Sequence, residues 1–294
     1  MRTRIYSTGL LCLAMIATAS SARSEAIGIS FYGSLYDIDL ATGAATNLRN
    51  TGLQSVVGVA LRADGALFTM TTFGDNIPST LMRIDPLTGA ATVIGAVGLD
   101  IREGDLGFDP STQELFGLFN LGSGGTQSLL RLDADTGQAT VIGVVPGGVD
   151  DMSGLTFDAS GNLLVLETRI STDGDSRLLT LDKSTGAILS ALTLDRQLGV
   201  VGGLSYDGLS GNLYLVEGNF GSSDPNSLYT VDRTTGGLTA VGPTGLSTEG
   251  LAGLTITPFA VAVPEPASVV LLGLGVAGLG VRLLRQPHRR AMTR

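Results

Sequence analysis

The chain has 294 residues, of which 43% are hydrophobic, with 27 Asp and Glu against 18 Lys and Arg. Residues 24–262 contain 26 of the acidic residues and 10 of the basic ones, which gives this region a net charge near −16. An acidic excess of this size excludes the usual electrostatic basis for binding nucleic acid or anionic membrane surfaces. The region is long enough for one domain with an extensive hydrophobic core.

Residues 24–262 also lack histidine and cysteine, because His288 and Cys12 are the only ones in the chain. This composition excludes disulfides, Ser-His-Asp triads and metal sites with histidine or thiolate ligands from the region. Catalysis there would have to use carboxylates, tyrosine, arginine or a metal ion held by carboxylates.

The N-terminus has the pattern of a secretory signal peptide. Arg2 and Arg4 form a basic start, residues 10–19 are mainly apolar, and small residues at 17–22 offer a cleavage site. The pattern predicts a signal peptide over residues 1–22 that is removed on export. A lipoprotein signal at Cys12 is disfavoured, because apolar residues continue after the thiol.

A segment of nine residues then recurs five times, first at 35–43 and last at 228–236. Each copy alternates apolar residues, as a half-buried strand does, and ends in Asp-x-x-Thr-Gly. In such a turn the aspartate accepts hydrogen bonds from backbone amides, and the glycine supplies a positive φ. We therefore expect a structural role for the five turn aspartates, which lie 46 to 50 residues apart: Asp39, Asp85, Asp133, Asp182 and Asp232.

A second hairpin, again with an aspartate in its turn, lies between successive copies at 57–68, 105–116, 153–164 and 203–214. Two hairpins per repeat give four strands, which is one blade of a propeller. The sequence therefore predicts an all-β fold, a five-bladed β-propeller of ~48-residue repeats over residues 26–258. A six-bladed ring with one degenerate blade and an open β-solenoid are the alternatives.

The two ends of the repeat region predict how the ring closes. Residues 250–258 read as a first strand with no second strand after it, whereas residues 26–33 read as a second strand that runs into the 35–43 hairpin. Pairing these two segments would complete one shared blade and leave no open edge between the ends.

The repeats resemble those of secreted propellers with Leu-Tyr-x-Ile-Asp-x-x-Thr-Gly signatures. The resemblance covers residues 27–258 and implies the fold. It implies no catalytic residue, because this turn occurs in proteins with many unrelated activities.

Carboxylates that differ between the repeats are the candidates for a site. Five of them precede the first strand of a blade and two follow the second strand, so in a propeller they would lie around one mouth of the central channel. Oxygen ligands in such a ring suit Ca²⁺. The sequence favours solvated acidic loops, with a Ca²⁺ site as the alternative, for Glu103, Asp105, Asp150, Asp151, Glu249, Glu167 and Glu217.

The last part of the chain, residues 259–294, departs from the repeat pattern. A motif at 263–266 is followed by an uncharged apolar run at 267–281 and then by five arginines. Extended to residue 284, the run is long enough for a thin transmembrane segment. The arginines favour a cytoplasmic location for residues 285–294. A plain tail anchor and a C-terminal helix docked on the domain are the alternatives.

This tail resembles the PEP-CTERM sorting signal of Gram-negative bacteria, which has a Pro-Glu-Pro motif, an apolar span and a basic end. The resemblance implies that an exosortase, a membrane-embedded cysteine protease, recognises and cuts the tail. It further implies anchoring in the inner membrane through the C-terminus, and a place at the cell surface or outside the cell after processing. The residues that carry the resemblance are Val263, Pro264, Glu265, Pro266, Arg282 and Arg285.

Together these features predict an exported, surface- or matrix-associated protein without catalytic activity, whose propeller binds exopolysaccharide or a protein partner. The polysaccharide expectation comes from the PEP-CTERM resemblance, because that family is associated with exopolysaccharide and biofilm-forming bacteria. The alternative is a Ca²⁺-dependent hydrolase or lyase with carboxylates in the propeller channel.

Overall fold

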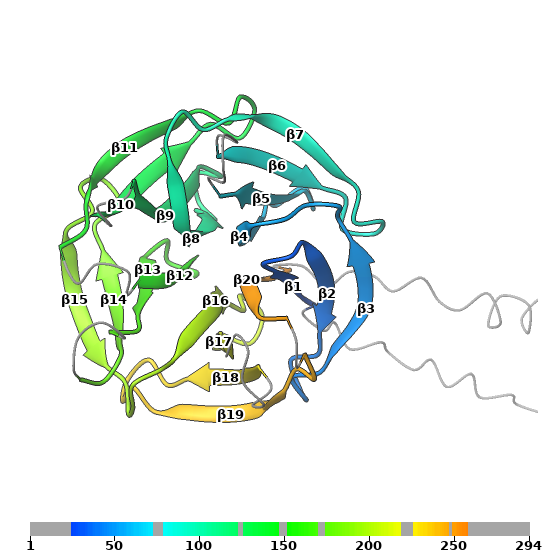
Figure 1. Ribbon diagram of the computed structural model, residues 1–294. Coiled ribbons are helices and arrows are strands. Elements are labelled where there is room, and N and C mark those ends of the chain that lie inside the picture. Colours follow the sequence, from blue (N-terminus) through cyan, green and yellow to red (C-terminus); the bar gives the residue numbers. More distant parts are fainter. Residues whose placement is uncertain are drawn as a thin grey trace, which may run out of the picture.

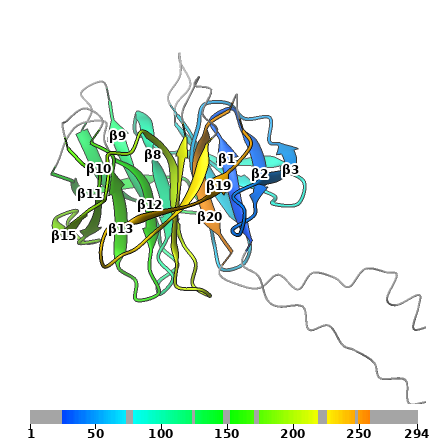
Figure 2. The ribbon, with the colours of Figure 1, turned by 90° about the horizontal axis from the view of Figure 1, so that it is seen from below.

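The computed structural model describes residues 25–72, 79–122, 126–146, 152–169, 174–218, 226–246 and 249–257. These residues form five four-stranded antiparallel sheets that stand as blades around a central axis (Figure 1). Figure 2 shows the same blades from the side, with their strand ends gathered on two opposite faces. The five-bladed β-propeller is confirmed. None of the described residues belongs to a helix of the length and hydropathy needed to span a bilayer.

Each blade runs from an inner strand at the axis to an outer strand at the rim. In this order, blade 1 contains β20 (Leu251–Ile256), β1 (Ala26–Ser30), β2 (Ser34–Ile38) and β3 (Ala45–Asn50). Blade 2 contains β4 (Val56–Leu61), β5 (Leu67–Thr71), β6 (Thr80–Ile84) and β7 (Ala91–Ala96). Blade 3 contains β8 (Ile101–Phe108), β9 (Leu115–Leu121), β10 (Thr126–Leu132) and β11 (Ala139–Val144). Blade 4 contains β12 (Met152–Phe157), β13 (Leu163–Glu167), β14 (Arg177–Leu181) and β15 (Ile188–Thr193). Blade 5 contains β16 (Val200–Tyr206), β17 (Leu213–Gly218), β18 (Ser227–Val231) and β19 (Leu238–Pro243).

Blade 1 is built from both ends of the described chain, as the unmatched strand in the sequence predicts. The inner strand β20 pairs antiparallel with β1, so that Gly28 lies opposite Leu254. Beside this pair the amide of Thr257 donates to the carbonyl of Glu25 at 2.8 Å, which extends the contact by one residue. The ring is therefore closed by hydrogen bonds between residues more than two hundred positions apart.

The hydrophobic core lies between neighbouring blades. Strand side chains alternate between the two faces of a sheet, and here each face packs against the next blade. Five clusters of buried side chains result, one for each pair of adjacent blades. Phe68 of blade 2 and Phe119 of blade 3, for example, belong to one cluster and are both at most 1% exposed. Burial of this apolar area supplies most of the stabilisation of the ring.

The repeated Asp-x-x-Thr-Gly turn joins the two outer strands of each blade. In blade 2 the carboxylate of Asp85 accepts hydrogen bonds from the amides of Leu87 at 2.8 Å and Thr88 at 3.2 Å. The five turn glycines have φ angles between 76° and 81°, a region that glycine adopts without strain. A Cβ on Gly137 would also lie 2.5 Å from the carbonyl oxygen of Gly95 in the neighbouring blade. The motif therefore shapes the turn and also permits close contact between blades.

Candidate functional site

The channel has two different mouths. Because the strands of a blade alternate in direction, the tight turns of both hairpins lie at one mouth, for example residues 62–66 and 85–90 of blade 2. We call this side the turn face. The connections from the second to the third strand, and those from one blade to the next, lie at the other mouth, which we call the loop face.

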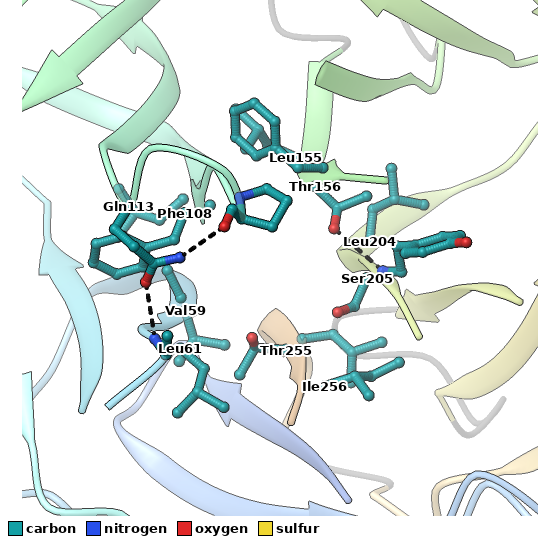
Figure 3. Close-up of a pocket in the computed structure, with 18 residues that line it drawn as sticks. Val59, Leu61, Phe108, Gln113, Leu155, Thr156, Leu204, Ser205, Thr255 and Ile256 are labelled. Atoms are coloured by element: carbon teal, nitrogen blue, oxygen red, sulfur yellow. Dashed lines mark hydrogen bonds between the residues drawn. The ribbon is translucent and has the colours of Figure 1, made fainter. Parts of the chain in front are cut away.

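A pocket of about 180 Å³ opens at the turn face on the propeller axis (Figure 3). We call it the axial pocket. All five blades contribute the last residues of their inner strands to its wall, and residues from the inner turns of blades 2 and 3 complete it. The strand residues are 59–61, 106–108, 155–157, 204–206 and 254–256, and the turn residues are Ala63, Pro110 and Gln113.

The next-to-last residue of each inner strand gives the pocket an uneven wall. Three consecutive inner strands place a hydroxyl there, and the other two strands have only a methyl group or a hydrogen atom. The hydroxyl residues are 5% to 9% exposed, and in Figure 3 they surround one side of the opening. Hydroxyls both donate and accept hydrogen bonds, so this side can orient a polar ligand. The five residues are Thr156, Ser205, Thr255, Ala60 and Gly107.

Three aromatic residues contribute to the remaining wall beside aliphatic side chains such as Leu61 and Ile256. Phe108, Phe157 and Tyr206 are the last residues of their inner strands and line the axial pocket. The guanidinium carbon of Arg233 lies 5.5 Å from the centre of the Tyr206 ring, and this contact helps to hold the ring in place. No lining residue carries a formal charge at neutral pH, so the pocket suits an uncharged ligand.

Gln113 lies at the rim of the axial pocket and links two blades. Its side-chain oxygen accepts a hydrogen bond from the amide of Ala63 at 3.1 Å, and its amide nitrogen donates to the carbonyl of Pro110 at 3.2 Å. Its φ is 59°, a left-handed conformation that costs a non-glycine residue on the order of 1 kcal/mol. The inner turns of blades 2 and 4 have Gly65 and Gly161 in the corresponding place.

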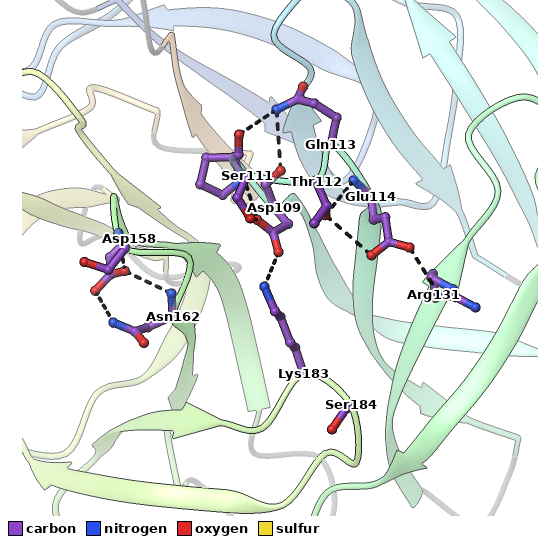
Figure 4. A network of polar contacts seen from close by, with 12 residues as sticks. Asp109, Ser111, Thr112, Gln113, Glu114, Arg131, Asp158, Asn162, Lys183 and Ser184 are labelled. Carbon is purple, nitrogen blue, oxygen red and sulfur yellow. Dashed lines mark hydrogen bonds and ion pairs between the residues drawn. The ribbon is translucent and has the colours of Figure 1, made fainter.

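Buried ion pairs connect the turns of successive blades on the turn face. Lys183 of blade 4 binds the carboxylate of Asp109 in blade 3 (Figure 4), and Arg233 of blade 5 binds Asp158 of blade 4 at 2.6 Å. Burial alone would raise the pKa of Asp109, but hydrogen bonds from Lys183 and Ser111 lower its pKa to about 2. These pairs fix the turns that surround the axial pocket.

Two of the carboxylates predicted to line a channel mouth form ion pairs on the loop face. Both carboxylate oxygens of Glu167 bind Arg177 on the adjacent strand. Glu217 binds Arg196 at 2.7 Å. Burial raises the pKa of Glu217, but Arg196 and the backbone amide of Gly199 together outweigh it, so the net shift is downward.

The other predicted acids lie apart from these pairs. Glu249 accepts a hydrogen bond from the hydroxyl of Tyr36 at 3.3 Å, Glu103 is exposed on β8, and Asp105 is buried inside the channel. Asp150 and Asp151 fall outside the described residues, as do the signal peptide and the sorting tail with Val263, Pro264, Glu265, Pro266, Arg282 and Arg285. Within the part of the chain that the structure describes, no three His, Cys, Asp or Glu side chains form a group that could hold a metal ion. The Ca²⁺ site stays a prediction.

Sequence reasoning did not identify the axial pocket. Its hydroxyls, its aromatic rings and Gln113 belong to no motif. One difference in the sequence does mark the pocket rim. Among the inner turns of blades 2 to 5, Gln113 occupies a place where the other three turns have glycine.

Comparisons with known proteins agree with both parts of the chain. Residues 262–286 match the family of the PEP-CTERM protein-sorting motif. A search of curated proteins found no match. The structure is similar to a chain in the crystal structure of a nidogen/laminin complex, with a TM-score of 0.51 and 16% identity, covering 82% of this chain and 99% of that one. This similarity shows the fold alone.

Two further solved structures are less similar. TolB from Acinetobacter baumannii gives a TM-score of 0.45 at 15% identity over 76% of this chain and 51% of that one. Hydrazine synthase from Kuenenia stuttgartiensis gives 0.44 at 10% identity over 70% and 62%. The chain thus combines a five-bladed β-propeller with a C-terminal PEP-CTERM sorting motif, which implies export and processing by an exosortase.

Proposed function

We propose that the exported protein is a non-catalytic component of the cell surface or extracellular matrix, and that its axial pocket binds a neutral sugar unit of an exopolysaccharide. The observation that carries this proposal is the lining of the pocket, where three hydroxyls face one side and three aromatic residues stand among aliphatic ones in the rest. Labelling of intact cells with an antibody against the propeller tests the surface location.

The chemistry of a sugar matches both parts of this wall. The hydroxyls of Thr156, Ser205 and Thr255 can exchange hydrogen bonds with sugar hydroxyls, which fixes the orientation of the ligand. The apolar C–H faces of a sugar ring can pack on Phe108, Phe157 and Tyr206, which bury large areas and keep few rotatable bonds. The acidic surface of the protein repels anionic polysaccharides, and the neutral lining offers them no ion pair.

The size of the pocket limits what it can hold. Its volume of about 180 Å³ is below the roughly 300–1,000 Å³ of pockets for drug-sized ligands. We therefore expect recognition of one sugar ring, such as the end of a chain or a branch. Glycosidases use a pair of carboxylates at the scissile bond, and the lining residues include none, which favours binding over hydrolysis.

The test is a binding measurement with neutral oligosaccharides prepared from the exopolysaccharide of the host bacterium. We expect binding by the purified protein, and a loss of at least tenfold in affinity in the triple variant Thr156→Val, Ser205→Ala, Thr255→Val. This loss corresponds to about 1.4 kcal/mol, a modest value for three hydrogen bonds. The control is Thr140→Val, which makes a similar change on the exposed face of β11.

The variants also define a result that contradicts the proposal. If the triple variant retains the affinity of the unmodified protein, the sugar binds elsewhere. If no neutral oligosaccharide binds while a protein from the matrix does, the partner is a protein. Circular dichroism and thermal unfolding of each variant verify that the fold is intact.

A further inference from the structure

A ring of five residues lies directly beneath the axial pocket, at the fourth residue from the end of each inner strand. We call this ring of residues the neck. Four of the five strands have glycine in this place and one has aspartate, so that a single side chain is present in the ring. The five residues are Gly58, Asp105, Gly154, Gly203 and Gly253.

The glycines are required by the close approach of the inner strands. A Cβ on Gly203 would lie 2.3 Å from the amide nitrogen of Leu254, and one on Gly253 would lie 2.5 Å from the amide nitrogen of Val59. Both distances are well below van der Waals contact, and the atoms approached are backbone atoms of the next blade. The neck therefore has room for few side-chain atoms.

Backbone N–H groups converge on the one side chain that is present. The carboxyl of Asp105 accepts hydrogen bonds from Leu106 at 2.8 Å and from Leu155 at 3.0 Å, through different oxygens. The amides of Val59 and Leu204, which hold the equivalent places in blades 2 and 5, also act to lower the pKa of this carboxyl. Each of these residues directly follows the neck position of its strand. An inner strand is an edge of its sheet, so such amides lack a partner within their own blade.

We propose that the neck is a carboxyl-binding ring of backbone N–H groups, and that Asp105 is its built-in ligand. Through this one group blade 4 is hydrogen-bonded to blade 3 on the axis, and the equivalent amides of blades 2 and 5 act on the same carboxyl. Convergent backbone amides of this kind bind carboxylates and other anions elsewhere in proteins.

Among the residues that the structure describes, none forms an ion pair with Asp105. The inner strands β4, β12 and β20 have no titratable side chain, β16 has Tyr206, and β8 itself has Arg102 and Glu103. On the second strands, Glu167 and Glu217 are already paired with arginines. Asp105 is 2% exposed, and burial raises its pKa to about 8, although the four backbone amides act in the opposite direction. Backbone dipoles are thus the groups that balance this carboxyl.

The test removes the Asp105 side chain by mutation and replaces it with acetate added to the solution. Asp105→Gly makes the ring uniform and deletes a CH₂–COOH group, which has the heavy atoms of acetic acid and acetate. At about pH 5, where acetic acid and acetate coexist, we expect the variant to melt several degrees below the unmodified protein. Acetate should restore part of this loss in the variant while leaving the unmodified protein unchanged. Propionate and chloride at the same concentration are the controls, because propionate is too large for the neck.

The outcome that overturns the proposal is an equal effect of acetate on both proteins, or an equal effect of acetate and propionate on the variant. If Asp105→Gly does not fold, NMR of the unmodified protein gives an independent test. The amide protons of Val59, Leu106, Leu155 and Leu204 should shift together with one apparent pKa, and this transition should vanish in Asp105→Asn. Amides that shift separately, or that shift in the same way in Asp105→Asn, contradict the ring.

Discussion

Asp105 in the neck and Asp109 on the turn face are only four residues apart in blade 3, and both side chains are buried, yet their surroundings differ. Asp105 meets backbone amides and no cation, whereas Asp109 meets the ammonium group of Lys183. Burial therefore raises the pKa of Asp105 to about 8, while Lys183 and Ser111 outweigh burial and lower the pKa of Asp109 to about 2. The blades are joined by two kinds of contact with opposite responses to pH.

The largest expected effect is the pH dependence caused by Asp105. A raised pKa in the folded state means that folding takes up a proton. The contribution of Asp105 to stability is therefore fully present below its unfolded pKa of about 4 and is lost as pH rises to about 8. Across this window we expect a loss of a few kcal/mol in the free energy of unfolding. Asp105→Asn, which cannot ionise, should remove this slope.

Denaturant unfolding of both proteins between about pH 4 and pH 8 measures the effect. Parallel curves for Asp105→Asn and the unmodified protein would mean that the carboxyl does not titrate in this window.

A smaller effect is expected at Asp109, and in the opposite direction. Lys183→Met leaves the Asp109 carboxylate buried without its cation, which should cost about 1–3 kcal/mol near neutral pH. The folded pKa of Asp109 is lowered, so its contribution is present above about pH 4 and is lost as pH falls toward about 2. The difference between Lys183→Met and the unmodified protein should therefore shrink in acid.

Arg131→Met is the matched control for Lys183→Met. Arg131 binds Glu114 at 3.1 Å, but both side chains are largely exposed, so the variant should change the free energy of unfolding by less than about 0.5 kcal/mol. If Lys183→Met and Arg131→Met lowered the free energy of unfolding equally, burial of Asp109 would not make its ion pair more stabilising than an exposed one.

The smallest effect concerns Ca²⁺ and the loop face. Glu167 and Glu217 already bind arginines, so a cation would have to displace Arg177 and Arg196. We expect Ca²⁺ to shift the melting temperature by less than about 1 °C relative to a chelator, because a ligand stabilises the folded state appreciably only when its concentration exceeds its dissociation constant. Tight binding in a calorimetric titration, with a clear rise in melting temperature, would instead favour the metal-dependent hydrolase or lyase.

The sequence was informative about the ring because its signals repeat. Five copies of Asp-x-x-Thr-Gly set the number of blades, and one unmatched strand at each end indicated the closure that β1 and β20 make. These features depend on local turn chemistry and on alternation along a strand, both of which can be read from neighbouring residues.

The pocket and the neck depend on comparisons between blades instead. Thr156, Ser205 and Thr255 share a wall only because equal positions of different inner strands meet at the axis. The sequence pattern places the acids before the first strands in one ring around a channel mouth. In the structure Asp105 belongs to β8 and lies in the neck, where its neighbours are backbone amides. Alignment of the five inner strands by their last residues would have revealed one aspartate among four glycines.

The pairing of β1 with β20 has a consequence for the order of events during export. β1 follows the N-terminus, and its inner neighbour is the last strand of the propeller, so Gly28 meets Leu254 only after 225 intervening residues have crossed the membrane. Until then β1 presents an unpaired strand edge, which is prone to aggregation. Contacts of such long sequence separation form slowly. The ring therefore closes only once its final strand, which precedes the sorting tail, is available to pair with β1.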